Sequence, residues 1–368
     1  MKGIKSNHKI LLIIISLLLF ICCNWKKKDK EIYCTADDFV KMEKIDIHCH
    51  INVDRPDFME EAVANNFKIL TINTDVDEYL GIEEQQELAL KQIKAFPDNL
   101  AYLTSFRLKD WNDSNFQRKT IAYLDSSFKY GAIGVKVWKN IGMIEKDEDG
   151  KFIMIDNPKL DPIFDYIEKM GKTVCGHLGE PKNCWLPIDS MTVNNDKKYY
   201  AEFPEYHMYL HPEFPSYDDQ IEARDNMLKK HPNLRFVGAH LGSLEWSVDE
   251  LAKHLDMFPN MAVDMAARIC HIEKQSQSDW QKVRDFFIKY QDRIIYGTDG
   301  NDNWGTDNDP VTMRKHIREV WIRDWNYLTT DDFMTSWEVD GQFKGIKLPK
   351  DVIEKIYYKN AVNWFPGI

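Results

Sequence analysis

The stretch "IDIHCH", residues 45–50, closes a short apolar run with two histidines one residue apart. Because successive side chains of a strand point to opposite faces, His48 and His50 would share one face of a strand. Two imidazoles on a buried face are costly unless their polar atoms find partners. The partner could be a metal ion, or the histidines could be hydrogen-bonded to carbonyls, and this stretch alone leaves both interpretations open.

Short β-rich runs recur after this one, and amphipathic stretches such as "IEEQQELALKQIKAF" separate most of them. The eight runs are residues 45–50, 68–73, 100–106, 132–137, 172–177, 234–240, 261–265 and 293–297. Eight strands that alternate with helices are typical of a (β/α)₈ TIM barrel, whose active site lies at the C-terminal ends of the strands. The sequence therefore predicts an α/β fold with one barrel domain over residues 45–368.

Two long interruptions, residues 178–217 and 299–310, follow the fifth and the eighth run. Loops of this length in a compact domain are usually functional. The first is rich in aromatic residues and prolines. It could be a packed cover over the mouth of the barrel or a wall of the substrate site, and the two interpretations are compatible.

The chain is acidic: it has 48 Lys and Arg against 59 Asp and Glu, which gives a formal net charge of -11. Nucleic-acid recognition needs a basic face, which this composition does not suggest. We therefore expect a small-molecule substrate and no nucleic-acid partner.

The N-terminus, "MKGIKSNHKILLIIISLLLFICCNWKKKDK", has a basic segment and then an apolar run over residues 10–23. This run is too short for a membrane-spanning helix, which needs about 20 residues. A secretory signal is the better interpretation, and the terminal cysteines resemble a bacterial lipoprotein signal. We expect a signal peptide over residues 1–22, lipidation at Cys23 with Cys22 as the alternative, and a tether over residues 23–44. The protein would then be lipid-anchored in a bacterial cell envelope, on the periplasmic or cell-surface side.

Residues that can bind metals stand at the ends of several predicted strands. The motifs are "IDIHCH", "GVKVW", "TVCGHLGEP", "RFVGAHLGS", "MAVDMAAR" and "IIYGTDG". Each lies where a barrel strand would open into the active-site mouth. The histidine or acid of a single motif could lie in the core or cap a turn. Several such motifs at the ends of successive strands favour a metal site instead.

Together with "PNLRFVGAHLGS" and "IYYKNAVNWF", these motifs resemble the amidohydrolase superfamily from about residue 45 to the end. The resemblance is to the branch with aminocarboxymuconate semialdehyde decarboxylase, resorcylate-type decarboxylases and lactonases. It implies that His48, His50, His177 and Asp299 bind one divalent ion, for which zinc or alternatively manganese suits the ligand types. His240 would lie beside the ion. The catalytic residues would be His240, as a carbonyl-polarising group or proton shuttle, and Asp299, as both ligand and proton acceptor.

Further polar residues near the strand ends have two interpretations each. Lys136 could be carboxylated and bridge two metals, as in some superfamily members, but we favour one metal with Lys136 in a polar contact within the barrel. Arg268 could bind a substrate carboxylate or form a structural ion pair. Asp264 could contact substrate or orient a neighbouring side chain, and Glu180 is expected to cap a turn.

The function expected from these features is metal-dependent hydrolysis of a small, oxygen-rich ester, lactone or amide, with an activated water as nucleophile. A non-oxidative decarboxylase could use the same ligand set. A non-catalytic surface lipoprotein that binds a glycan through its aromatic loops is a third possibility, but the complete set of expected ligands disfavours it.

Overall fold

The computed structural model describes residues 31–76, 80–303 and 309–368. The predicted signal peptide and Cys23 lie outside these residues. Residues Tyr33–Ile368 form one compact unit, and the description below concerns this unit. Among the residues that the structure describes, no helix has the length and apolar character needed to cross a membrane.

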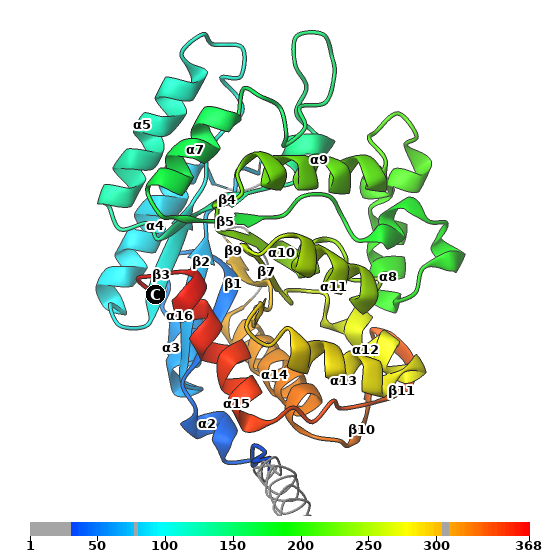
Figure 1. The fold of residues 1–368 in the computed structure, drawn as a ribbon. Coiled ribbons are helices and arrows are strands. Elements are labelled where there is room, and N and C mark those ends of the chain that lie inside the picture. Colours follow the sequence, from blue (N-terminus) through cyan, green and yellow to red (C-terminus); the bar gives the residue numbers. More distant parts are fainter. Residues whose placement is uncertain (1–30, 77–79, 304–308) are drawn as a thin grey trace, which may run out of the picture. The chain divides into compact units, whose positions relative to one another are not determined.

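A parallel sheet forms the centre of the unit Tyr33–Ile368, and helices surround it (Figure 1). Its strands are β1 Lys44–Asn52, β2 Phe67–Ile72, β3 Leu100–Thr104, β4 Gly134–Val137, β5 Thr173–Gly176, β6 Phe236–Gly238, β7 Met261–Asp264, β8 Ile294–Ile295 and β9 Gly300–Asn303. They are hydrogen-bonded in the order β8-β7-β6-β5-β4-β3-β2-β1-β9. Each of the eight predicted runs overlaps one of the strands β1 to β8, so the eight-strand prediction is confirmed.

The sheet curls until the segment that follows β8 reaches β1. The Ile47 amide donates to the Tyr296 carbonyl (3.1 Å), and the Asp299 amide donates to the His48 carbonyl (2.8 Å). The short strand β9 then pairs in parallel with β1. These bonds join the two ends of the strand order, and they confirm the predicted TIM-barrel fold.

Helices lie between most of the strands, as the amphipathic stretches predicted. The α-helices are α2 Asp38–Lys41, α3 Asp57–Ala64, α4 Ile82–Ala95, α5 Phe116–Lys129, α6 Asn140–Met143, α7 Asp161–Lys169, α8 Asn194–Glu202, α9 Tyr217–Lys230, α10 Ala239–Gly242, α11 Val248–Met257, α12 Ile269–Ser278, α13 Trp280–Lys289, α14 Pro310–Thr329, α15 Lys350–Glu354 and α16 Asn360–Trp364. In α4 the buried residues Ile82, Gln85, Ala89 and Gln92 recur every three or four positions, which places them on one face. A capping box formed by Ser216 and Asp219 fixes the start of α9.

The long interruption after β5 folds as a packed cover. It contains α8 and the short helices η1 Lys182–Trp185, η2 Ile188–Ser190, η3 Pro204–Tyr206 and η4 Met208–Leu210. Cys184, Met191, Tyr200 and Met208 form a small apolar core with Met143. Two contacts hold the cover to the rest of the unit. In the first, His271 Nε2 lies 3.1 Å from Asp196 Oδ2 in a buried pair. In the second, the Asn194 amide donates to the Glu338 carbonyl in the hairpin of β10 Phe333–Ser336 and β11 Val339–Lys344.

Part of the predicted tether is packed within the barrel unit. Tyr33 forms a β-bridge with Pro349. The Phe39 ring is buried, and its centroid lies 5.6 Å from that of the Trp325 ring. Lys44 is the first residue of β1. The packed unit therefore includes residues 33–44, which the sequence assigned to the tether, because their aromatic side chains complete the core. The chain ends in π-helix η5 Lys355–Lys359 and α16, where Trp364 packs in an apolar cluster with residues of several strands.

Candidate metal centre

The C-terminal ends of the strands bring five of the predicted site residues together. His48 and His50 lie in β1, His240 follows β6 in α10, and Asp264 ends β7. Asp299 lies between β8 and β9, and its backbone amide bonds to the His48 carbonyl. The C-terminal ends of four strands, β1, β6, β7 and β8, therefore converge on one small volume, as a barrel mouth requires.

The two histidines of β1 both approach one carboxylate in this volume. The Nε2 atoms of His48 and His50 are each 3.4 Å from Asp299 Oδ1. One ligand atom each of His48, His240 and Asp299 lies within 4.8 Å of the others, a spacing that could hold a metal ion. The two histidines of "IDIHCH" thus face the same carboxylate, which agrees with the shared strand face that their spacing predicted.

His48, His50 and His240 share one hydrogen-bonding arrangement. Each has its Nδ1 within hydrogen-bond distance of an oxygen atom. The oxygens are Asp264 Oδ2 for His48 (2.8 Å), the Ile72 carbonyl for His50 (3.0 Å) and the Ala266 carbonyl for His240 (2.8 Å). When the Nδ1 proton is donated in this way, the lone pair is left on Nε2, which is the arrangement of metal-binding histidines. The donor set therefore fits a divalent ion.

Burial keeps the rings of His48, His177 and His240 in the form that binds metals. Removal from water lowers the pKa of the His48 and His240 imidazoles and lowers that of His177 to about 4. At neutral pH the three rings are therefore uncharged, and each retains a lone pair for a ligand.

His177, which follows β5, lies at the edge of the group. Its ring centroid is 4.2 Å from that of His240, and its Nε2 is 3.7 Å from Glu180 Oε2. This buried Nε2 has no hydrogen-bond partner among the described residues, so a metal ion would satisfy it. The structure thus groups His240 with His48 and Asp299, and it places His177 next to His240.

A model of the amidohydrolase family matches residues 45–367. The chain belongs to this family. Members of the superfamily generally bind a metal ion, which agrees with the donor set described above.

Solved structures support the fold of this amidohydrolase. An amidohydrolase II structure is 15% identical, with a TM-score of 0.50 over 88% of this chain and 99% of that chain. The 2,6-dihydroxybenzoate decarboxylase from Rhizobium is 14% identical, with a TM-score of 0.50 over 88% of this chain and 98% of that chain. No curated protein matches the chain with significant similarity. At these identities the likeness concerns the fold alone.

Asp264 has an orienting position in the amidohydrolase site. Its Oδ2 contacts His48 Nδ1, and its Oδ1 accepts bonds from the backbone amides of His240 (2.7 Å) and Ala266 (3.1 Å). The side chain is fully buried. Both oxygens are thus used within the protein, so the geometry favours the orienting alternative over a substrate contact.

Lys136 and Arg268 contact neighbouring protein groups. Lys136 Nζ lies 3.1 Å from His48 Nε2 inside the barrel, which is the polar contact expected from the sequence. Arg268 Nη2 lies 3.7 Å from Glu180 Oε2, and its Nη1 donates to the Ala267 carbonyl. This geometry fits the ion-pair alternative for Arg268.

The expectation that Glu180 caps a turn is wrong. Glu180 is buried, with Oε1 paired to Lys139 and Oε2 near both His177 and Arg268. Although burial alone would raise its pKa, the charge of Lys139 and the contact with His177 bring the pKa below its ordinary value. Sequence reasoning missed Glu180 and Lys139 as parts of the site. The only signal was their position, just after the fifth and the fourth strand.

Proposed function

We propose that this amidohydrolase is a metal-dependent enzyme that hydrolyses a small ester, lactone or amide. The strongest support is the shared orientation of His48, His50 and His240, whose Nδ1 atoms face oxygens. His48, His50, His177 and Asp299 would hold one divalent ion, zinc or alternatively manganese. Such an ion, when bound, polarises a carbonyl and lowers the pKa of a coordinated water to about 7.

The protein groups around this centre would orient the reactants and carry protons. The Ala266 carbonyl fixes the tautomer of His240, so that its Nε2 can accept a proton and return it to a leaving group. The Asp299 side chain is 34% exposed, enough for one carboxylate oxygen to face a reacting water. Asp264 holds the His48 ring in place through Nδ1.

The proposed reaction is tested by a substrate panel before and after chelation. We expect at least one ester, lactone or amide to be hydrolysed, activity to be lost with a chelator, and activity to return with zinc or manganese. Aromatic and enoic acids, including 2,6-dihydroxybenzoate, belong in the panel because of the decarboxylase alternative. Carbon dioxide release from an acid without hydrolysis of any ester, lactone or amide would replace the hydrolase proposal, and a metal-loaded protein with no turnover would favour the glycan-binding alternative.

We also propose, from the sequence alone, that the protein is anchored in a bacterial cell envelope through Cys23. Cys23→Ser is expected to abolish lipid labelling and move the protein to the soluble fraction, because one residue would carry the acyl chains. Metabolic labelling with a fatty acid and membrane fractionation measure both effects. Labelling that persists in this variant and disappears in Cys22→Ser would move the modification by one residue.

A further inference from the structure

A small cavity lies beside the candidate metal centre. It has a volume of about 260 Å³, and Glu180 forms part of its wall. The same carboxyl lies 3.7 Å from His177 Nε2, so the cavity begins one side chain away from the candidate ligands. Most of its wall is apolar and comes from Met143, Ile144, Phe152, Tyr206, Met208 and Phe214. We refer to it as the inner cavity.

The wall of the inner cavity has four charged residues, Lys139, Lys146, Glu180 and Glu205, and the first three contact other groups on the same wall. Lys139 forms an ion pair with Glu180, and its Nζ lies 5.5 Å from the centroid of the Tyr206 ring. Lys146 Nζ lies 4.3 Å from the centroid of the Phe152 ring. A hydroxyl-rich ligand would therefore exchange its water mostly for apolar carbon and for charges that already have contacts within the wall, which is unfavourable.

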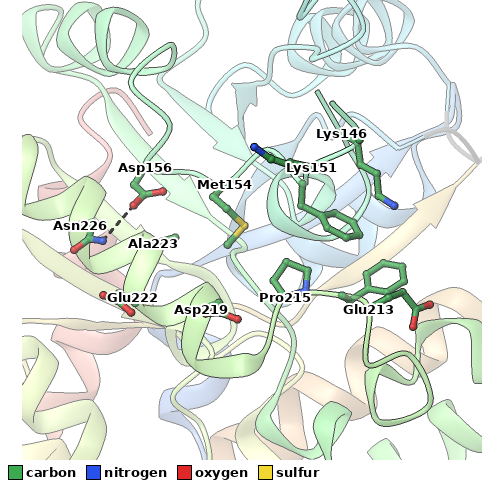
Figure 2. Close-up of a pocket in the computed structure, with 13 residues that line it drawn as sticks. Lys146, Lys151, Met154, Asp156, Glu213, Pro215, Asp219, Glu222, Ala223 and Asn226 are labelled. Carbon is green, nitrogen blue, oxygen red and sulfur yellow. Dashed lines mark hydrogen bonds between the residues drawn. The ribbon is translucent and has the colours of Figure 1, made fainter. Parts of the chain in front are cut away.

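A larger and more open cavity adjoins the inner one. It has a volume of about 630 Å³, and its wall shares Lys146, Phe152 and Phe214 with the inner cavity. Figure 2 shows its polar side chains, among them the bonded pair of Asn226 and Asp156. The rings of Phe152 and Phe214 are 4.9 Å apart between centroids. Because both rings line both cavities, this pair forms the boundary between them.

We propose that the inner cavity binds an apolar group of the substrate, a straight alkyl chain or an aromatic ring, and that Phe152 and Phe214 limit its length. The inference rests on the proposed hydrolase function, because the scissile carbonyl would lie on the Glu180 side, next to the metal centre. It also replaces the oxygen-rich substrate expected from the sequence with a more apolar ester, lactone or amide. Phe214 is then a specificity-determining residue.

Methyl ketones test the cavity without hydrolysis, because they present a carbonyl and an alkyl chain but no leaving group. We expect the dissociation constant of the metal-loaded full chain to fall by about fourfold per added methylene from butanone upward. The fall should stop when the chain reaches the Phe152 and Phe214 boundary. Xylitol, a hydroxyl-rich molecule of similar size, should not bind. Isothermal titration calorimetry measures each constant.

Phe214→Ala joins the two cavities and should move the end of this trend to longer ketones. Tyr209→Ala is the matched control, because Tyr209 lies in the same cover, is 51% exposed, and lines neither cavity. Phe214→Leu, which retains an apolar side chain, should give a smaller shift and serves if the alanine variant does not fold.

Affinities that do not depend on chain length, tighter binding of xylitol, or an unchanged limit in both Phe214 variants would overturn the inference. Ketone binding as expected, without turnover of any ester, lactone or amide, would leave the cavity assignment intact and count against the proposed function. The two proposals can therefore fail separately.

Discussion

Replacing both His48 and His50 with alanine is expected to remove the metal ion and to abolish turnover. The wild-type protein should contain about one divalent ion per chain, since the two candidate donor groups among the described residues, His48 with His240 and Asp299 and His48 with Cys175 and Asp264, share His48. The double variant loses both Nε2 atoms that lie 3.4 Å from Asp299 Oδ1. Elemental analysis and turnover are measured on the same preparation, with thermal unfolding as a check of folding.

Two further variants give this experiment its controls. His211→Ala should retain both metal and activity, because His211 lies in the cover and its Nε2 bonds to the Pro204 carbonyl. Asp264→Asn should weaken metal affinity by about 10–100-fold, since an orienting partner of a ligand is altered rather than the ligand itself. Metal retained at wild-type affinity in the double variant would contradict the assignment. Two ions per chain that are lost in Lys136→Ala would instead establish a carboxylated bridging lysine.

The barrel strands were predictable because their signal is local. A parallel strand that is buried on both faces has a continuous apolar run, and β2, β3 and β7 all contain such runs. Strand β9, "GNDN", has no such signal, because its residues disfavour strands. It forms through pairing with residues 49–52 of β1, which is a tertiary contact. The packing of Phe39 against Trp325 likewise joins segments that are far apart in sequence.

The candidate site was predictable in its residue types but not in its fine geometry. The spacing in "IDIHCH" was enough to place His48 and His50 together. It could not show that His240 adopts the left-handed region, with a φ of 58°, and that its amide is held by Asp264. In the folded chain the His240 ring centroid lies 4.7 Å from that of His48 and 4.2 Å from that of His177. The surroundings of Glu180 come from three separate strand ends, so no local pattern could reveal them.

His240→Asn should retain the metal ion while turnover falls by about 10²–10⁴-fold, the usual contribution of a positioned acid or base. The amide keeps a polar side chain at the site but cannot carry a proton at neutral pH. Asparagine also tolerates the left-handed backbone that His240 adopts better than most residues, so the turn after β6 should persist. Metal content and turnover on one preparation test the two effects separately.

His177→Asn is the matched variant, because the His177 and His240 rings are neighbours, with centroids 4.2 Å apart. If His177 is the ligand, this variant loses metal and His240→Asn does not. If His240→Asn loses metal and His177→Asn does not, His240 is the ligand. Its place in the group with His48 and Asp299 would explain that result. Near-normal turnover of His240→Asn with metal intact would leave His240 a structural residue and would transfer the proton-carrying role to Asp299, whose carboxylate faces both histidines of β1.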